Sequence, residues 1–267
     1  MNFLENFLEL YFNGLLVHPD HEPGGKTVLL ILLGCAVTGY LIGSLNSAII
    51  LSRLMYHDDI RKYGSGNAGM TNMMRVYGKT AAGLTLLFDI LKTGVAVWIG
   101  ILLLGQNAAY ISGATCVVGH CYPLYYKFKG GKGVAVTAGL CLFANPPVFL
   151  ILFIIFAIVV GFTKYISLGS IMSLLFFPLM LRSFYQFLAS TNPQLRPFVP
   201  PTVLFPALFI TVLVILQHRE NIKRLWAGEE NKFSFKKSKK TPHQQQLDAQ
   251  REAREDRISD ENSDKNK

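Results

Sequence analysis

The chain has 267 residues, of which 51% are hydrophobic and 16% are charged. Soluble domains carry roughly 25% charged residues, so this composition excludes an ordinary soluble enzyme and a disordered protein. The formal net charge is +9, which indicates that the protein has a basic face. We predict an all-α polytopic membrane protein. The four cysteines are scattered through apolar runs without a CxxC pair, so we expect no zinc site, disulfide framework or cofactor.

Charge and hydrophobicity divide the chain into three parts. Residues 1–27 carry Glu5 and Glu9 where a signal peptide would carry basic residues, and their apolar positions follow helical spacing. We expect this extension to form a helix at the membrane interface. Residues 28–228 form the membrane domain. Residues 229–267 hold ten basic and nine acidic residues, which predicts a charged, disordered tail with a membrane-surface anchor at 236–240.

Seven apolar segments are candidates for membrane spans, which need roughly 17 to 25 apolar residues each. The segments at 107–121 and 133–145 are short for a full crossing, so five crossings is the alternative to seven. The predicted segments are, approximately, 28–52, 80–104, 107–121, 133–145, 147–162, 166–181 and 203–217.

The positive-inside rule gives the orientation. With seven crossings, one side receives nine basic residues from the loops and thirteen more beyond His218, whereas the other side receives only Lys26, Arg182 and Arg196. This count predicts an outside N-terminus and a cytoplasmic tail, and it favours an odd number of crossings.

The loop after the first span is rich in glycine. Such a loop can turn its backbone N–H groups inward around an anion, and a following helix N-terminus adds a favourable dipole. Arg75 can bind a phosphate through two parallel hydrogen bonds. The alternative is a simple turn between two helices. The candidate residues of this loop are Gly64, Ser65, Gly66, Asn67, Thr71, Asn72 and Arg75.

A second loop at 127–135 has glycines on both sides of Lys132, namely Gly130, Gly131 and Gly133. An apolar segment follows, so this loop resembles a phosphate cradle at a helix start, with lysine as a point charge. The alternative is a basic anchor beside anionic lipid, which suits Lys127 and Lys129.

A third polar set, at 218–225, follows the last span. If it is helical, His218 and Asn221 share one face and could bind a polar substrate at the membrane edge. The alternative is a basic cluster that contacts acidic headgroups. The three sets fall on one predicted side, which suits a phosphorylated substrate and a lipid chain in an adjacent cavity.

Burial of charge inside a span is costly, so charged residues there are expected to be paired or functional. Asp89 and Lys92 are three residues apart and can pair on one helix face. His120 lies near the end of a segment, where a capping role is expected. No second metal-binding residue adjoins any histidine in the sequence, so we predict no metal site.

Three stretches resemble the signature regions of a bacterial family. They are GSGNAGMTNMMR at 64–75, GHCYPLYYKFKGGKGVAVTAG at 119–139 and HRENIKRLWAGEE at 218–230. They look like the membrane glycerol-3-phosphate acyltransferases that use acyl phosphate, the PlsY family. The likeness covers about residues 34 to 230. Ala68 stands where the family usually has proline, and Thr93 where glycine is common.

The resemblance implies a seven-helix enzyme of the bacterial inner membrane with its site facing the cytoplasm. It implies acyl transfer from acyl phosphate to glycerol 3-phosphate, giving lysophosphatidate and phosphate. The substrate's own phosphate would accept the hydroxyl proton, with His218 as base the alternative. No acyl-enzyme is expected, because no base adjoins the two serines. The family residues matched here are Ser65, Arg75, Lys132, Ser170, His218 and Asn221.

Other classes of protein remain as alternatives. A transporter of a phosphorylated metabolite would show motifs on both sides of the membrane and two related halves, and neither is visible. A lipid-binding scaffold without chemistry is a third reading. The sequence HQQQLD at 243–248 matches the HxxxxD pattern of another acyltransferase superfamily, but it lies in the polar tail and is read as chance. We expect a monomer that contacts membrane lipid and no nucleic acid.

Overall fold

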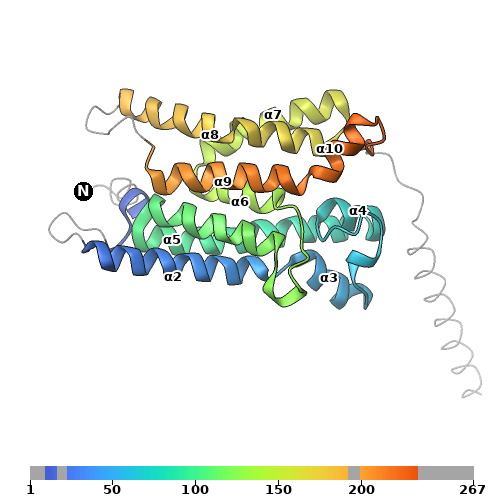
Figure 1. Ribbon diagram of the computed structural model, residues 1–267, viewed down its shortest axis with the longest axis horizontal. Helices are drawn as coiled ribbons and strands as arrows, with labels where there is room; N and C mark the ends of the chain where they lie inside the picture. Colours follow the sequence, from blue (N-terminus) through green and yellow to red (C-terminus); the bar gives the residue numbers. More distant parts are fainter. Residues whose placement is uncertain (1–9, 17–22, 192–198, 234–267) are drawn as a thin grey trace, which may run out of the picture.

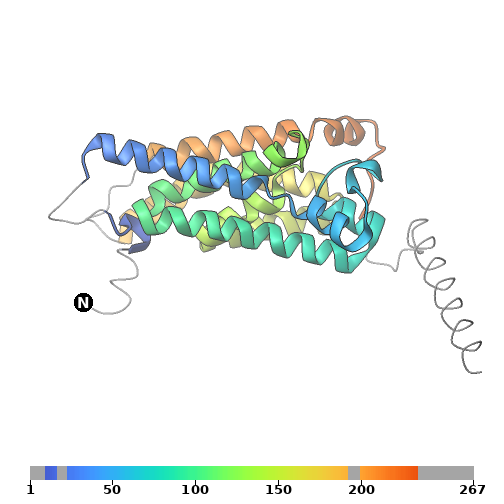
Figure 2. The same cartoon turned by 90° about the horizontal axis from the view of Figure 1, so that it is seen from below.

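The computed structural model describes residues 10–16, 23–191 and 199–233. Within these ranges the fold contains helices and no strand, as predicted. The long helices lie lengthwise beside one another, and the short helices α3, α4 and α10 gather at one end (Figures 1 and 2). The helices are α2 (Gly25–Ser44), α3 (Ser47–Tyr56), α4 (Met70–Tyr77), α5 (Lys79–Cys121), α6 (Val134–Ala144), α7 (Pro146–Thr163), α8 (Ile166–Thr191), α9 (Pro201–Gln217) and α10 (Arg219–Trp226).

Four helical stretches in the described ranges are long and apolar enough to cross a membrane, or five if α9 and α10 form one bent span. The predicted span at 28–52 is present but interrupted between α2 and α3. There Asn46 Oδ1 accepts a hydrogen bond from the Ile49 amide at 3.1 Å. An asparagine cap satisfies one of the amides that have no partner inside a helix. Helix α8 continues to Thr191, beyond the predicted end at 181.

Helix α5 is a helical hairpin rather than one straight rod. The chain leaves helical geometry at residues 104–105, where Gly105 has a φ of +59°. Ser112 Oγ then donates a hydrogen bond to the Ala96 carbonyl at 2.7 Å, and a Cβ on Gly100 would overlap the Ala108 backbone. These contacts place two antiparallel arms side by side. The predicted segments 80–104 and 107–121 correspond to these arms.

Glycine allows α2 to pack closely on the second arm of α5. A Cβ at Gly39 or Gly43 would overlap the carbonyl oxygen of Ser112 or Cys116. Close approach through small residues is the usual way in which membrane helices associate, because lipid tails provide no hydrophobic drive between helices. This contact fixes the hairpin against the first span.

The described part of the N-terminal extension, residues 10–16, packs against the end of the bundle opposite α3 and α4 (Figure 1). The Tyr11 hydroxyl donates to the Ala144 carbonyl at 2.5 Å, and the Leu15 amide donates to the Leu102 carbonyl at 2.8 Å. This part therefore contacts the helix bundle itself rather than only the membrane interface. The other predictions for the extension, the anchor at 236–240 and the HxxxxD match at 243–248 lie outside the described residues.

Candidate active site

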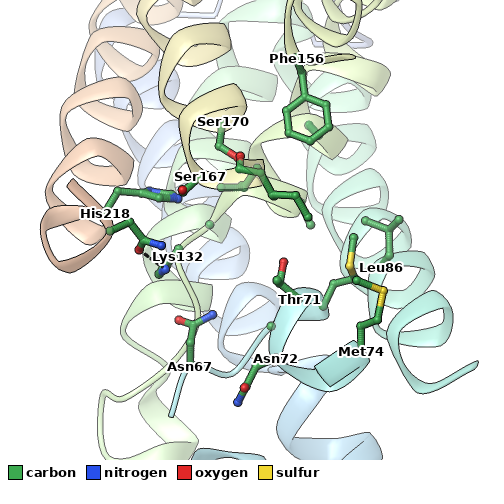
Figure 3. A pocket seen from close by; sticks show the side chains of 18 of the residues that line it. Asn67, Thr71, Asn72, Met74, Leu86, Lys132, Phe156, Ser167, Ser170 and His218 are labelled. Atoms are coloured by element: carbon green, nitrogen blue, oxygen red, sulfur yellow. Dashed lines mark hydrogen bonds between the residues drawn. The ribbon is translucent and has the colours of Figure 1, made fainter. Parts of the chain in front are cut away.

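A cavity of about 920 Å³ lies among α4, the first arm of α5, α6, α7, α8 and the junction of α9 with α10. One part of its wall is polar and comes from the three predicted motifs (Figure 3). The other part is apolar, with Leu86, Ile90, Phe149, Leu152, Phe153 and Phe156. Such a lining suits an amphiphilic ligand with a charged head and a hydrocarbon chain.

The candidate residues of the three motifs and Ser170 all line this cavity, except Gly66, Gly130 and Gly131. The structure therefore brings together loops that are more than a hundred residues apart in the chain. The lining residues among them are Gly64, Ser65, Asn67, Thr71, Asn72, Arg75, Lys132, Gly133, Ser170, His218 and Asn221.

Asn72 holds the first glycine-rich loop in shape. Its Oδ1 accepts from the Ser65 amide at 2.9 Å, and its Nδ2 donates to the Tyr63 carbonyl at 3.0 Å. The side chain is only 1% exposed, and Figure 3 shows it turned away from the middle of the cavity. The loop itself needs glycine, because Gly64 and Gly66 have φ of +59° and +70°. Asn72 thus supports the loop through both ends of its amide.

Gly66, Gly130 and Gly131, which the sequence analysis counted among the substrate-binding residues, are not among the residues that line the cavity. A Cβ on Gly130 would overlap the His120 carbonyl oxygen, and one on Gly131 would overlap the His120 ring. Gly66 lies in the left-handed region of the first loop. The physical role of these glycines is therefore close approach and turn formation.

The two glycine-rich loops are joined directly. The Ala68 amide donates to the Gly130 carbonyl at 3.4 Å, and the Gly131 amide donates to the His120 carbonyl at 3.1 Å. Asn46, at the break between α2 and α3, donates from Nδ2 to the Ala68 carbonyl at 3.3 Å. The position of each loop thus depends on the other loop and on two membrane helices.

Two helices begin at the cavity. Gly69 precedes α4 and Gly133 precedes α6, and neither helix start has a side-chain cap. The first amides of a helix have no partner inside it, and they carry partial positive charge. Thr71, Val134 and Ala135, from these first turns, line the cavity, and Figure 3 shows the Thr71 hydroxyl pointing into it. The arrangement is suited to an anionic group.

Lys132 is a partly buried cation at the site. Its Nζ donates a hydrogen bond to Oδ1 of Asn221. Burial lowers the pKa of Lys132 to about 8, and the nearby charges of Arg224 and Arg75 act in the same direction. Arg75 is exposed at the cavity wall, and no carboxylate in the described part of the chain forms a salt bridge with it. Both cations are thus placed to bind a ligand's negative charge.

Glu230 is a site residue that the sequence analysis missed. One of its oxygens accepts from Asn221 Nδ2 at 2.7 Å and from Ser167 Oγ at 2.8 Å, and the other accepts from Arg224 Nε at 2.8 Å. Burial raises the pKa of this carboxyl, but the three hydrogen bonds outweigh it and hold the pKa below its usual value. The side chain is 7% exposed. Its place at the end of the third motif was the available signal, but the prediction assigned it to the tail.

His218 lies where α9 and α10 meet at a bend of 56°. Its Nδ1 is 2.7 Å from the Val214 carbonyl oxygen. A carbonyl only accepts, so Nδ1 carries a proton, and in the neutral ring Nε2 keeps its lone pair. His218 is 3% exposed and faces Lys132 and Ser167 in Figure 3. The Ser170 hydroxyl donates to the Ile166 carbonyl at 2.9 Å, within its own helix.

The predicted pairing of Asp89 with Lys92 is confirmed, at 2.7 Å. His120 differs from its prediction, because its side chain joins this pair, with Nδ1 3.1 Å from Lys92 Nζ and 3.5 Å from Asp89 Oδ1, instead of capping a helix. An acidic residue therefore does adjoin a histidine, since the hairpin in α5 brings together positions that are distant in sequence. Within the described ranges no group of three metal-binding residues occurs.

Residues 33–228 match the model of the family described as glycerol-3-phosphate acyltransferase. This chain belongs to the glycerol-3-phosphate acyltransferase family. It is 42% identical over 201 residues to the glycerol-3-phosphate acyltransferase of Thermoanaerobacter pseudethanolicus. The aligned region covers 75% of this chain and 95% of the relative. It is 40% identical over 237 residues to that of Mycoplasmopsis agalactiae, covering 79% of this chain and 97% of the relative.

Two solved structures of the family have the same fold. PlsY (YgiH), an integral membrane glycerol 3-phosphate acyltransferase, in its glycerol 3-phosphate form has a TM-score of 0.65 and 34% identity, covering 76% of this chain and 96% of that one. The lysophosphatidic acid form gives a TM-score of 0.63 and 33% identity over 76% and 95%. The resemblance seen in the sequence is thus confirmed, and the family fold is that of a multi-pass membrane protein.

Proposed function

We propose that this chain transfers a fatty acyl group from acyl phosphate to the 1-hydroxyl of sn-glycerol 3-phosphate. The products are lysophosphatidate and inorganic phosphate, in the first acylation of bacterial phospholipid synthesis. The observation that carries the proposal is one cavity with two kinds of wall, cationic at Lys132 and Arg75 and apolar along α7. Membership of the acyltransferase family supports it, as do the two ligand forms in which PlsY was solved.

The acyl-phosphate headgroup binds between the two glycine-rich loops. Ser65, Lys132 and the starts of α4 and α6 surround this place. Lys132 and Arg75 neutralise negative charge on the phosphate as it departs, which is the stage at which preorganised cations lower the barrier. The acyl chain extends along Phe149, Phe153 and the other apolar side chains of α7 and α8.

Glycerol 3-phosphate binds at the adjoining part of the wall, which His218, Asn221 and Ser170 line. Its 1-hydroxyl oxygen attacks the acyl carbonyl carbon, and the bond from that carbon to the phosphate oxygen breaks. The hydroxyl proton passes to the phosphate of the acceptor substrate. His218 is the alternative base, because its Nε2 lone pair is free when Nδ1 is bonded to Val214. The site uses no metal and no covalent acyl-enzyme.

The reaction takes place at the cytoplasmic face of the bacterial inner membrane, in a monomer. Seven crossings follow if α2, both arms of α5, α6, α7, α8 and α9 each traverse the bilayer, which puts the N-terminus outside. Helix α4, which carries Arg75, and the loop before α6, which carries Lys132, lie at the same end as α10 (Figure 1). The positive-inside rule assigns this end to the cytoplasm.

The test compares two donors side by side. Purified protein in detergent or lipid receives glycerol 3-phosphate with either palmitoyl phosphate or palmitoyl-CoA, and lysophosphatidate and released phosphate are measured. Product from the phosphate donor alone is the expected result. Product from palmitoyl-CoA alone would overturn the donor assignment, and no product from either donor in a folded sample would overturn the acyltransfer itself.

A further inference from the structure

The Lys92 ammonium, inside the α5 hairpin, lies close to a carboxylate, a backbone carbonyl and an imidazole nitrogen. Its Nζ lies 2.7 Å from Asp89 Oδ1, 3.0 Å from the Leu45 carbonyl oxygen and 3.1 Å from His120 Nδ1. An ammonium has three donors and no acceptor. These three groups come from both arms of the hairpin and from the end of α2.

This arrangement fixes the tautomer of His120. Because Lys92 can only donate, the His120 Nδ1 atom at 3.1 Å must present its lone pair. The distance from Nδ1 to Asp89 Oδ1 is longer, at 3.5 Å, so Lys92 is the nearer partner of Nδ1. A neutral imidazole with an unprotonated Nδ1 carries its proton on Nε2.

The His120 side chain borders the site. His120 is 3% exposed and lines the cavity, and a Cβ on Gly131 would overlap Nε2. None of the hydrogen bonds in the described ranges uses this nitrogen as a donor. Because His120 lines the cavity, this nitrogen can donate its proton to an acceptor on a ligand there. Lys132 directly follows Gly131 in this loop.

We propose that His120 is a further catalytic residue, whose Nε2–H donates a hydrogen bond to an oxygen of the acyl-phosphate headgroup. The inference rests on the proposed function, because it takes acyl phosphate as the ligand between the two glycine-rich loops. His120 stands at the base of the loop with Lys132, whereas Ser170 lies in α8, His218 lies between α9 and α10, and Asn221 lies in α10. Asp89 and Lys92 are positioning residues that hold the imidazole in its donor tautomer.

The first test separates the two ring nitrogens. His120→Asn keeps a polar group near Nδ1 and removes the donor at Nε2, while His120→Gln restores an N–H near the position of Nε2. We expect His120→Asn to lower kcat/KM for palmitoyl phosphate by about 10- to 100-fold, with the KM for glycerol 3-phosphate unchanged. His120→Gln recovers most of that loss. Unchanged kinetics in His120→Asn, or equal losses in both variants, would overturn the proposal.

A matched control separates chemistry from folding. Ser112→Ala removes a buried hydrogen bond of 2.7 Å between the same two arms of α5, away from the cavity lining. It should lower the thermal stability in detergent and leave kcat/KM for palmitoyl phosphate unchanged. If Ser112→Ala lost as much kcat/KM as His120→Asn, the effect of His120 would be structural and the proposal would be wrong.

A second measurement does not depend on turnover. In protein labelled with ¹⁵N-histidine, the His120 ring signals, assigned by their loss in His120→Gln, should show a protonated Nε2 and an unprotonated Nδ1. Addition of palmitoyl phosphate alone should shift the Nε2–H signal, and glycerol 3-phosphate alone should not. An Nε2–H signal that does not shift when palmitoyl phosphate is added would overturn the proposed hydrogen bond from His120 to the headgroup. A shift without turnover in the wild type would instead count against the proposed acyltransfer.

Discussion

The Lys132 ammonium donates a hydrogen bond to Oδ1 of Asn221, which lies 89 residues further along the chain. Asn221 uses its other amide atom to donate to Glu230 at 2.7 Å. The second glycine-rich loop, α10 and the segment after α10 therefore form one hydrogen-bonded unit. The cation beside the proposed acyl donor is held in place by the motif proposed to bind the acceptor, so the two substrate sites are mechanically linked.

Removal of either cavity cation should stop catalysis without unfolding the protein. Lys132→Ala and Arg75→Ala each delete positive charge that stabilises the departing phosphate, and each should lower kcat by about 100- to 1,000-fold. Phosphate release and thermal unfolding in detergent measure the two effects. Lys62→Ala is the control, because Lys62 is 68% exposed and pairs with Asp58 outside the cavity. Wild-type activity in both cavity variants would contradict the site assignment.

The pH dependence of kcat/KM should report the ionisation of Lys132. Burial lowers its pKa from the usual value to about 8, so the ammonium is present below that pH and is lost above it. We therefore expect kcat/KM to fall as the pH rises through about 8. Lys132→Arg should remove this fall, since a guanidinium stays charged, even if its overall rate is lower. A wild-type profile that stays flat to pH 10 would contradict the assignment.

Loss of the Glu230 carboxylate should destabilise the site. Glu230→Gln replaces an acceptor oxygen with a donor and breaks at least one of three hydrogen bonds, which should cost about 1–3 kcal/mol. The pKa of Glu230 is lowered in the folded state, so its stabilisation is complete above its ordinary pKa and is lost as the pH falls through the lowered value. Thermal unfolding of Glu230→Gln and of the exposed neighbour Glu229→Gln, from neutral to acid pH, measures this. Equal unfolding temperatures for the two variants would be the contrary result.

The contact between Gly130 and His120 should not tolerate a methyl group. Gly130→Ala places a Cβ against the His120 carbonyl oxygen, so the loop with Lys132 must shift and turnover should fall steeply. Gly83→Ala is the control, because a Cβ there meets nothing within 4 Å, and alanine should stabilise the helix by roughly 0.5–1 kcal/mol. Initial rates and unfolding temperatures of the two variants are compared. Full turnover in Gly130→Ala would show that the loop adapts.

The N-terminal extension should contribute stability and not catalysis. Tyr11→Phe removes the hydroxyl that donates to the Ala144 carbonyl, at an expected cost of about 1 kcal/mol. The segment 10–16, which contains Tyr11, lies at the end of the bundle away from α4 and α10 (Figure 1), so kcat should not change. Thermal unfolding and turnover of the same preparation test both halves, and a lower kcat would contradict the second.

The sequence by itself determined the fold class, most helix boundaries and the set of motifs. Apolar runs long enough to cross a bilayer can only be helical, because the membrane offers no partner for open backbone groups. The glycine and basic residues of the three motifs also kept their expected place, as most of them line one cavity. These features depend on local composition, which a sequence displays directly.

Only the tertiary structure decided which of those residues face the cavity. Gly130 and Gly131 look like ligand-binding glycines in sequence, but they pack on His120 because the hairpin in α5 brings its end against their loop. Glu230 accepts a hydrogen bond from Asn221, which is 9 residues away in the chain. Lys92 contacts His120, which is 28 residues away. Such pairings follow from packing between distant segments, which no local pattern encodes.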